Sequence, residues 1–184
     1  TRKLTVTQAM YILATWAPED GRRSLERDGF NDKTINEIRS RMREANPNWE
    51  VFVNWVVDSY LPSLRPKYSE SFKVLFGSKM PFVKKYFPLR RVGVAKPADI
   101  ANEGPLPLPS TVTGSVISRN GSTASIDLNS SFFEVLQENV VEMEVWAEMA
   151  PIIKDFNILM SSPAVKNAMN AIREGFATDF RKAA

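Results

Sequence analysis

Residues 131–149 read SFFEVLQENVVEMEVWAEM, and this stretch indicates the fold class. Its apolar side chains recur at spacings of three and four residues, which is typical of one face of an α-helix. Asn129, Ser130 or Ser131 supplies the N-cap, and Pro151 is expected to bend or interrupt the helix. The apolar stripe comprises Phe132, Val135, Leu136, Val140, Met143, Ala147 and Ala150.

Helical periodicity also dominates the rest of the chain. Pro18 is expected to stop the first helix, with residues 18–21 forming a turn. Gly29 and Gly77 are expected to end two later helices, because glycine readily follows the last helical residue. The expected helices cover residues 5–17, 21–28, 32–44, 48–60, 66–76, 131–149, 152–160 and 163–182, with a short turn at 80–86.

One of these helices, residues 48–60, reads NWEVFVNWVVDSY. It is apolar on almost every side, so we expect a buried helix. Its inner stripe is expected to comprise Val51, Phe52, Trp55, Val56 and Ser59.

Two segments lack helical periodicity. Residues 92–112 hold four prolines and two glycines, which is typical of a long loop or linker. Residues 113–128 contain Asn120-Gly121 between two short β-compatible runs, which predicts a hairpin with a type I′ turn. The sequence therefore predicts a mainly α fold, an irregular helical bundle with one small β-hairpin and a long Pro-rich loop.

The chain divides by charge. Residues 1–100 carry 18 Lys or Arg against 11 Asp or Glu, whereas residues 101–184 carry 6 against 10. We expect the two halves to differ in their partners or to attract each other. We assign 1–91 to a basic helical region, 92–112 to a Pro/Gly-rich loop and 113–184 to a hairpin plus an acidic helical region. Because the sequence starts without Met and ends in a helical pattern, we expect one cooperative module excised from a longer chain.

The 184 residues include neither cysteine nor histidine. The absence of cysteine excludes disulfides, thiolate nucleophiles and Cys-ligated metals. The absence of histidine removes most serine-type triads and the usual nitrogen ligand of transition metals. No phosphate-binding loop or G-x-S-x-G motif occurs either. We therefore predict that the chain is not an enzyme and holds no cofactor or metal.

The acidic face of the 131–149 helix is the first candidate for a functional site. Glu134, Glu138 and Glu142 are four residues apart and fall near one face. Helical-bundle metal sites use such carboxylates, but normally together with histidine. A solvated face, or one paired with the basic half of the chain, is the favoured interpretation.

The second candidate is the basic stretch 65–96. It carries nine Lys or Arg against Glu70 alone, with six interleaved aromatic residues. Cations with aromatics suit a nucleic-acid backbone and stacked bases. The other interpretation buries the aromatics in a core and directs the cations to solvent or to the acidic helix. The spacing matches no known nucleic-acid-binding signature.

Several phrases are shared with a known group of proteins. The stretches Tyr86-Phe87-Pro88-Leu89-Arg90-Arg91, Ile126-Asp127-Leu128 and 143–157 are the most specific of them. Over most of residues 10–170 the chain resembles a segment of the very large polyvalent proteins of phages and conjugative elements, especially those of gut Bacteroidetes. That resemblance implies a non-catalytic, mostly helical module of a multidomain chain, with enzymatic domains elsewhere and no catalytic residues here.

The segment YFPLRR at 86–91 also has a physical interpretation. Pro88 favours an extended backbone, which would direct Phe87 and Leu89 into the body. Arg90 and Arg91 could then form bidentate pairs with carboxylates of the Glu-rich helix or with Asp127. We favour this clamp between the two halves over a nucleic-acid role.

The sequence therefore predicts a non-catalytic structural or interaction module of a large phage or mobile-element protein. Its partners would be other domains of the parent chain or virion proteins, in the host cytoplasm or the virion. The alternative is a nucleic-acid-binding module that uses 65–96. No signal peptide or membrane span is expected. The candidate interaction residues are Lys84, Lys85, Tyr86, Phe87, Arg90, Arg91, Asp127 and Glu142.

Overall fold

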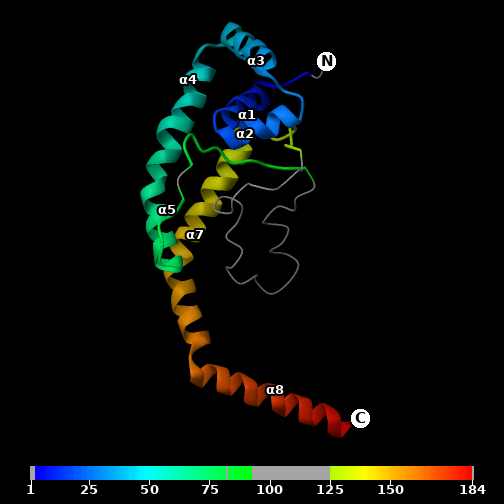
Figure 1. Cartoon of the computed structure of the whole chain (residues 1–184), viewed down its shortest axis with the longest axis vertical. Helices are drawn as coiled ribbons and strands as arrows, with labels where there is room; N and C mark the ends of the chain where they lie inside the picture. The colour runs from blue at the N-terminus through cyan, green and yellow to red at the C-terminus, as the bar shows by residue number, and fades with distance from the viewer. Residues whose placement is uncertain (1–2, 82, 93–124, 184) are drawn as a thin grey trace.

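The computed structural model describes residues 3–81, 83–92 and 125–183, and the side chains of the last helix as far as residue 173. These residues are mainly helical, as predicted (Figure 1). The expected loop and most of the expected hairpin lie outside the described residues. The described end of the hairpin, 125–128, forms an isolated antiparallel bridge between Ile126 and Arg91.

Helix α1 (Val6–Trp16) is the centre of the core. Thr5 caps it through a capping box: its hydroxyl accepts from the Gln8 amide, and the Gln8 side chain accepts from the Thr5 amide. Every residue from Ala9 to Trp16 is buried. A helix that is covered on all sides needs neighbours all round, and α1 contacts α2, α3, α4 and α7.

The predicted turn at 18–21 is wrong, because helix α2 (Glu19–Arg27) already starts at Glu19. Gly21 lies against the end of α1, and a Cβ atom added to it would stand 1.9 Å from the Thr15 carbonyl oxygen. This glycine permits close approach of two helices rather than a turn. Gly29 ends α2 as predicted. Its φ is +91°, and the amides of Gly29 and Phe30 donate to the carbonyls of Glu26 and Leu25.

Helix α3 (Asp32–Ala45) is capped by the Asn31 side chain. It is followed by a long rod made of α4 (Asn48–Trp55), a π-helical turn η1 (Val56–Tyr60) and α5 (Leu61–Phe76) (Figure 1). The expected break before residue 66 is absent. The π-turn lies directly before Pro62, where the Leu61 amide donates to Val56 O. Such a turn fits a residue that lacks an amide hydrogen into a helix. Gly77, with φ +69°, ends α5 as predicted.

The inner stripe expected for residues 48–60 is wrong in part: Val56 is buried and Phe52 packs against the core, but the other three members are exposed. Val51 and Trp55 are 66% and 50% exposed, whereas Val53, Val56 and Val57 are buried. Among the described elements α4 packs on α1 and α3, so the buried side chains are those that face these two helices. The apolar composition of the segment therefore does not report complete burial.

Helix α7 (Phe132–Ser161) runs unbroken through Pro151, so the expected interruption is absent. Ser131 caps it, since its hydroxyl accepts from the Glu134 amide. Pro151 leaves the Ala147 carbonyl without its helical donor. The Ser71 hydroxyl of α5 shares its proton between that carbonyl, at 3.3 Å, and the Lys67 carbonyl of its own helix, at 3.2 Å. A tertiary contact thus compensates the proline.

Helix α8 (Pro163–Ala183) follows after Ser162 and runs away from the other helices (Figure 1). We call residues 3–92 and 125–150 the body, and residues 151–183 the arm. The main core of the body draws on both ends of the sequence: Tyr11, Phe87 and Phe132 are all buried in it. Among the described residues, no helix is long and apolar enough to cross a membrane.

Candidate functional site

The segment 86–91 passes through the centre of the body. Phe87 is fully buried, stacks on Phe132 with ring centroids 5.1 Å apart and contacts Tyr11 at 6.1 Å. Tyr11 also fixes the backbone at Arg90: its hydroxyl accepts from the Arg90 amide at 2.9 Å and donates to the Arg90 carbonyl at 3.4 Å. Burial raises the pKa of the Tyr11 hydroxyl, so this group stays protonated as a donor.

The Arg90 side chain joins this segment to the acidic helix. Its guanidinium forms ion pairs with Glu134, at 2.7 Å, and with Glu138. The Arg90 side chain is 15% exposed and the two carboxylates are 44% and 43% exposed. A guanidinium bound to two carboxylates fixes the orientation of α7 against the segment.

The other predicted members of the clamp have different contacts. The Arg91 side chain donates to the Ser24 hydroxyl of α2 at 3.3 Å. The Asp127 carboxylate accepts from the Asn129 amide and the Ser130 hydroxyl, so it shapes its own turn. Glu142 is half-buried and its pKa is raised by burial, partly offset by Arg90.

A second charged contact joins α5 to α7. The Lys67 ammonium pairs with Glu144 and, at 2.8 Å, with Glu148. The Tyr68 hydroxyl donates to the Glu144 carboxylate at 2.9 Å. Hydrogen bonds from Lys67 and Tyr68 lower the pKa of Glu144.

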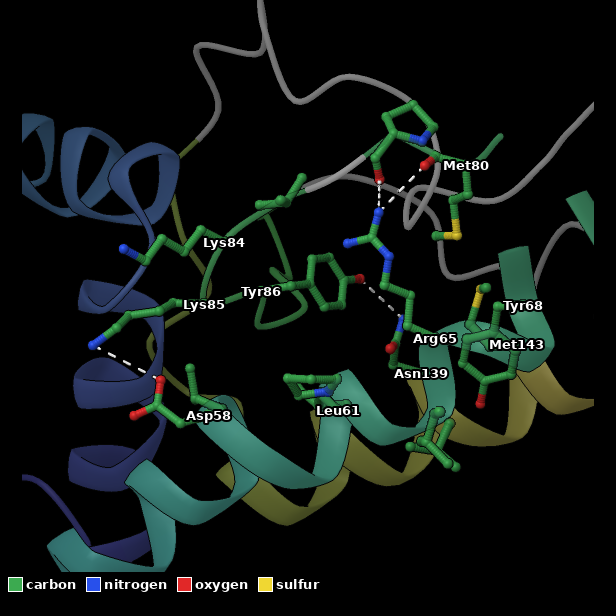
Figure 2. Close-up of a pocket in the computed structure, with 16 residues that line it drawn as sticks. Asp58, Leu61, Arg65, Tyr68, Met80, Lys84, Lys85, Tyr86, Asn139 and Met143 are labelled. Atoms are coloured by element: carbon green, nitrogen blue, oxygen red, sulfur yellow. Dashed lines mark hydrogen bonds and ion pairs between the residues drawn. The ribbon is translucent and has the colours of Figure 1, made fainter. Parts of the chain in front are cut away.

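Between these two contacts lies a cavity of about 310 Å³ (Figure 2). It is bounded by α5, η1, α7 and residues 80–81 and 83–86. The Tyr86 hydroxyl accepts from the Asn139 amide at 3.4 Å, across the cavity wall. The remaining wall is mostly apolar and comprises Val57, Leu61, Pro62, Leu64, Met80, Pro81, Val83, Val140 and Met143.

Charged side chains line the rim of the cavity. The Arg65 guanidinium donates to the carbonyls of Met80 and Pro81, at 3.3 and 3.2 Å (Figure 2). Lys85 pairs with Asp58 at 3.8 Å. Lys84 is exposed and forms no hydrogen bond or ion pair with another described residue. The lining therefore carries three cations against one carboxylate, and their combined field favours an anion in the cavity.

The predicted site residues thus separate into two groups. Lys84, Lys85 and Tyr86 line the cavity, whereas Phe87 and Arg90 belong to the core and the clamp. Sequence reasoning missed the cavity residues of the rod. The signal was Leu61, Leu64 and Tyr68 at i, i+3 and i+7, hidden because the neighbouring prolines suggested interruptions.

The basic stretch offers less free charge than its composition indicates. Of its eight described cations, five contact other groups of the protein: Arg65, Lys67, Lys85, Arg90 and Arg91. Lys73, Lys79 and Lys84 make no such contact with a described residue. Tyr68 and Phe87 are buried and cannot stack on bases.

The described residues contain no group of three Asp, Glu, His or Cys that could hold a metal ion. Two carboxylates of the acidic face, Glu134 and Glu138, instead neutralise Arg90. Comparison of the chain with protein-family models, with curated proteins and with solved structures finds no match.

Proposed function

We propose that the chain is a non-catalytic interaction module whose cavity receives an apolar segment of a partner protein that carries an acidic side chain. The observation behind the proposal is the combination of an apolar wall with three cations, Arg65, Lys84 and Lys85, among the lining residues. Binding pockets commonly join an apolar lining to a few polar groups that orient the ligand. A carboxylate of the partner could form an ion pair with the Lys84 ammonium without breaking an ion pair between described residues.

Charge complementarity within the body supports the same function over nucleic-acid binding. Lys67, Lys85 and Arg90 are paired with carboxylates of the chain itself. A nucleic-acid backbone would have to displace those carboxylates to use the cations. The ion pairs between the charged halves therefore stabilise the module itself, and the cavity is the surface that binds the partner.

The resemblance to polyvalent proteins indicates which kind of partner the module would have and where it would act. Within it, the partner is another domain of a large phage or mobile-element chain, or a virion protein. The module then acts in the host cytoplasm or in the particle.

The test uses two labelled peptides, one in which Leu and Phe alternate with Glu and one in which Lys replaces Glu. Fluorescence anisotropy of each peptide with the purified chain gives the affinities. We expect the Glu peptide to bind more tightly, and Lys84→Glu to weaken it roughly tenfold, which corresponds to about 1.4 kcal/mol.

The matched control is Lys79→Glu, which reverses a charge in the same basic stretch but outside the cavity lining. It should leave the affinity for the Glu peptide close to that of the parent. Equal losses from both variants would mean general electrostatic attraction and would contradict the cavity. Tighter binding of the Lys peptide would contradict the charge assignment.

A further inference from the structure

Helix α7 has apolar residues on two opposite faces. One face packs on α5 and carries Met143, Ala147 and Ala150, all buried. With 3.6 residues per turn, the opposite side of the helix carries a second apolar row. This outer face comprises Val141, Val145, Met149, Ile152, Phe156 and Leu159, which are 42–59% exposed.

The spacing of the outer face is that of a coiled-coil seam. From Val145 to Leu159 the apolar residues are separated by four, three, four and three residues. In heptad terms they alternate between d and a positions. A solvated helix face is normally polar, so this row indicates a helical partner.

We propose that a second copy of the chain covers the outer face of α7 as a parallel, in-register pair of helices. In that register each a or d residue meets its own equivalent. The acidic g residues Glu148 and Asp155 then lie beside e residues, which are Trp146, Ile153 and Met160. No charged side chain at e or g faces a like charge.

The antiparallel arrangement is disfavoured by the same residues. Antiparallel helices place g positions opposite g positions. Glu148, although paired with Lys67 at 2.8 Å, would then face Asp155 of the second copy, which forms no ion pair among the described residues, and this contact would occur twice by symmetry. The charge pattern of α7 therefore selects the parallel pair.

The extent of the outer face fits an interface of this kind. A covered side chain of this size removes roughly 100 Å² from water. The six residues of the outer face then supply roughly 600 Å² per partner, about 1,200 Å² in total, which is the lower end of the range for specific interfaces. Within the described part of the chain, α5 packs on the side of α7 that carries Met143, Ala147 and Ala150, which leaves the outer face to the second copy.

Sedimentation velocity over a concentration series tests the pairing. We expect the parent to sediment with twice the mass of one chain and Ile152→Glu to sediment as a monomer. Ile158→Glu is the matched control, because Ile158 is as exposed as Ile152 (60% against 59%) but lies on another side of α7. It should remain a dimer.

Cross-linking distinguishes the register. Because the chain has no cysteine, Phe156→Cys introduces a unique thiol. In the parallel pair this thiol meets its own equivalent, so oxidation should give a covalent dimer, whereas Ile158→Cys should not. A parent that stays monomeric, a dimer that survives Ile152→Glu, or cross-linking through position 158 alone would overturn the proposal. Lys84→Glu does not alter the outer face. A chain that dimerises but does not prefer the Glu peptide would contradict the cavity alone, and a chain that prefers the Glu peptide but stays monomeric would contradict the pairing alone.

Discussion

The body and the arm are both built from amphipathic or apolar helices, yet among the described residues only the body buries apolar side chains in a core. In the body, α1 is buried along most of its length, and Phe87 and Phe132 stack at the centre. In the arm, no described side chain between 151 and 173 is buried. The difference shows that helical periodicity identifies the apolar face of a helix but not the element that packs on that face.

The same contrast applies to charge. Within the body, cations of the first half meet carboxylates of α7, at Arg90 and again at Lys67. Along the arm, Lys154, Asp155 and Lys166 are exposed, and none forms an ion pair among the described residues. Attraction between the oppositely charged halves thus acts where the chain folds back on itself.

The largest expected effect separates the two regions by one type of substitution. Phe87→Ala should lower the free energy of unfolding by about 3–5 kcal/mol, because it leaves a cavity beside Phe132 and Tyr11. Phe156→Ala, in the arm, should change the stability of a single chain by less than about 0.5 kcal/mol. Urea denaturation followed by tryptophan fluorescence measures both.

Equal losses from the two alanine variants would mean that the arm is covered in the isolated chain. A difference that grows with dilution would instead report the pairing of α7. Circular dichroism of each folded variant serves as the control for helix content.

A smaller effect is expected at the clamp. Arg90→Met keeps the aliphatic stem but removes the contacts with Glu134 and Glu138, and should cost about 2 kcal/mol. Arg43→Met is the comparison: its 62% exposed side chain pairs with Glu50 on the surface, so its loss should be much smaller. Urea midpoints of the two variants provide the test.

A double-mutant cycle with Glu138→Gln isolates the clamp itself. Additive losses for Arg90→Met and Glu138→Gln would show that the ion pair contributes nothing beyond packing.

The smallest effect concerns two glutamates of α7 whose pKa values move in opposite directions. Glu144 has a pKa below its ordinary value of 4.5, owing to hydrogen bonds from Lys67 and Tyr68. Its contribution to stability is present above pH 4.5 and is lost as the pH falls through the lowered value. Glu142 has a pKa raised by burial, so its contribution is present below pH 4.5 and is lost as the pH rises through the raised value.

At pH 7 we therefore expect Glu144→Gln to lower the urea midpoint and Glu142→Gln to raise it slightly. Both differences should shrink in acid, where the parent carboxyls are protonated. Two variants that shift in the same direction at pH 7 would contradict the assigned environments.

Local signals in the sequence were sufficient for many helix ends. Asn129, Ser130 or Ser131 was expected to cap the long acidic helix, and Ser131 does so; Thr5 and Asn31 cap α1 and α3 through the same kind of local contact. Gly29 and Gly77 end their helices with positive φ. These features depend on residues within one turn of one another, so the sequence specifies them directly.

The predictions that failed depend on residues distant in the chain. Gly21 was interpreted as part of a turn because its contact with the Thr15 carbonyl exists only once α1 and α2 pack. Pro151 was expected to bend or interrupt its helix, and the absence of an interruption was not foreseen because Ser71, which contacts the freed carbonyl, lies 76 residues from Ala147. The cavity escaped prediction for the same reason, since its wall combines three separate segments.

By itself, the sequence determined the helical class, the caps and the opposite charges of the two halves, because each follows from composition or from neighbours within a few residues. Only the tertiary structure decided that Arg90 meets Glu134 and Glu138, that Lys84 stands at the rim of a cavity and that the outer face of α7 stays open. Those outcomes depend on how the helices pack, and the packing of distant segments is set by the whole chain at once.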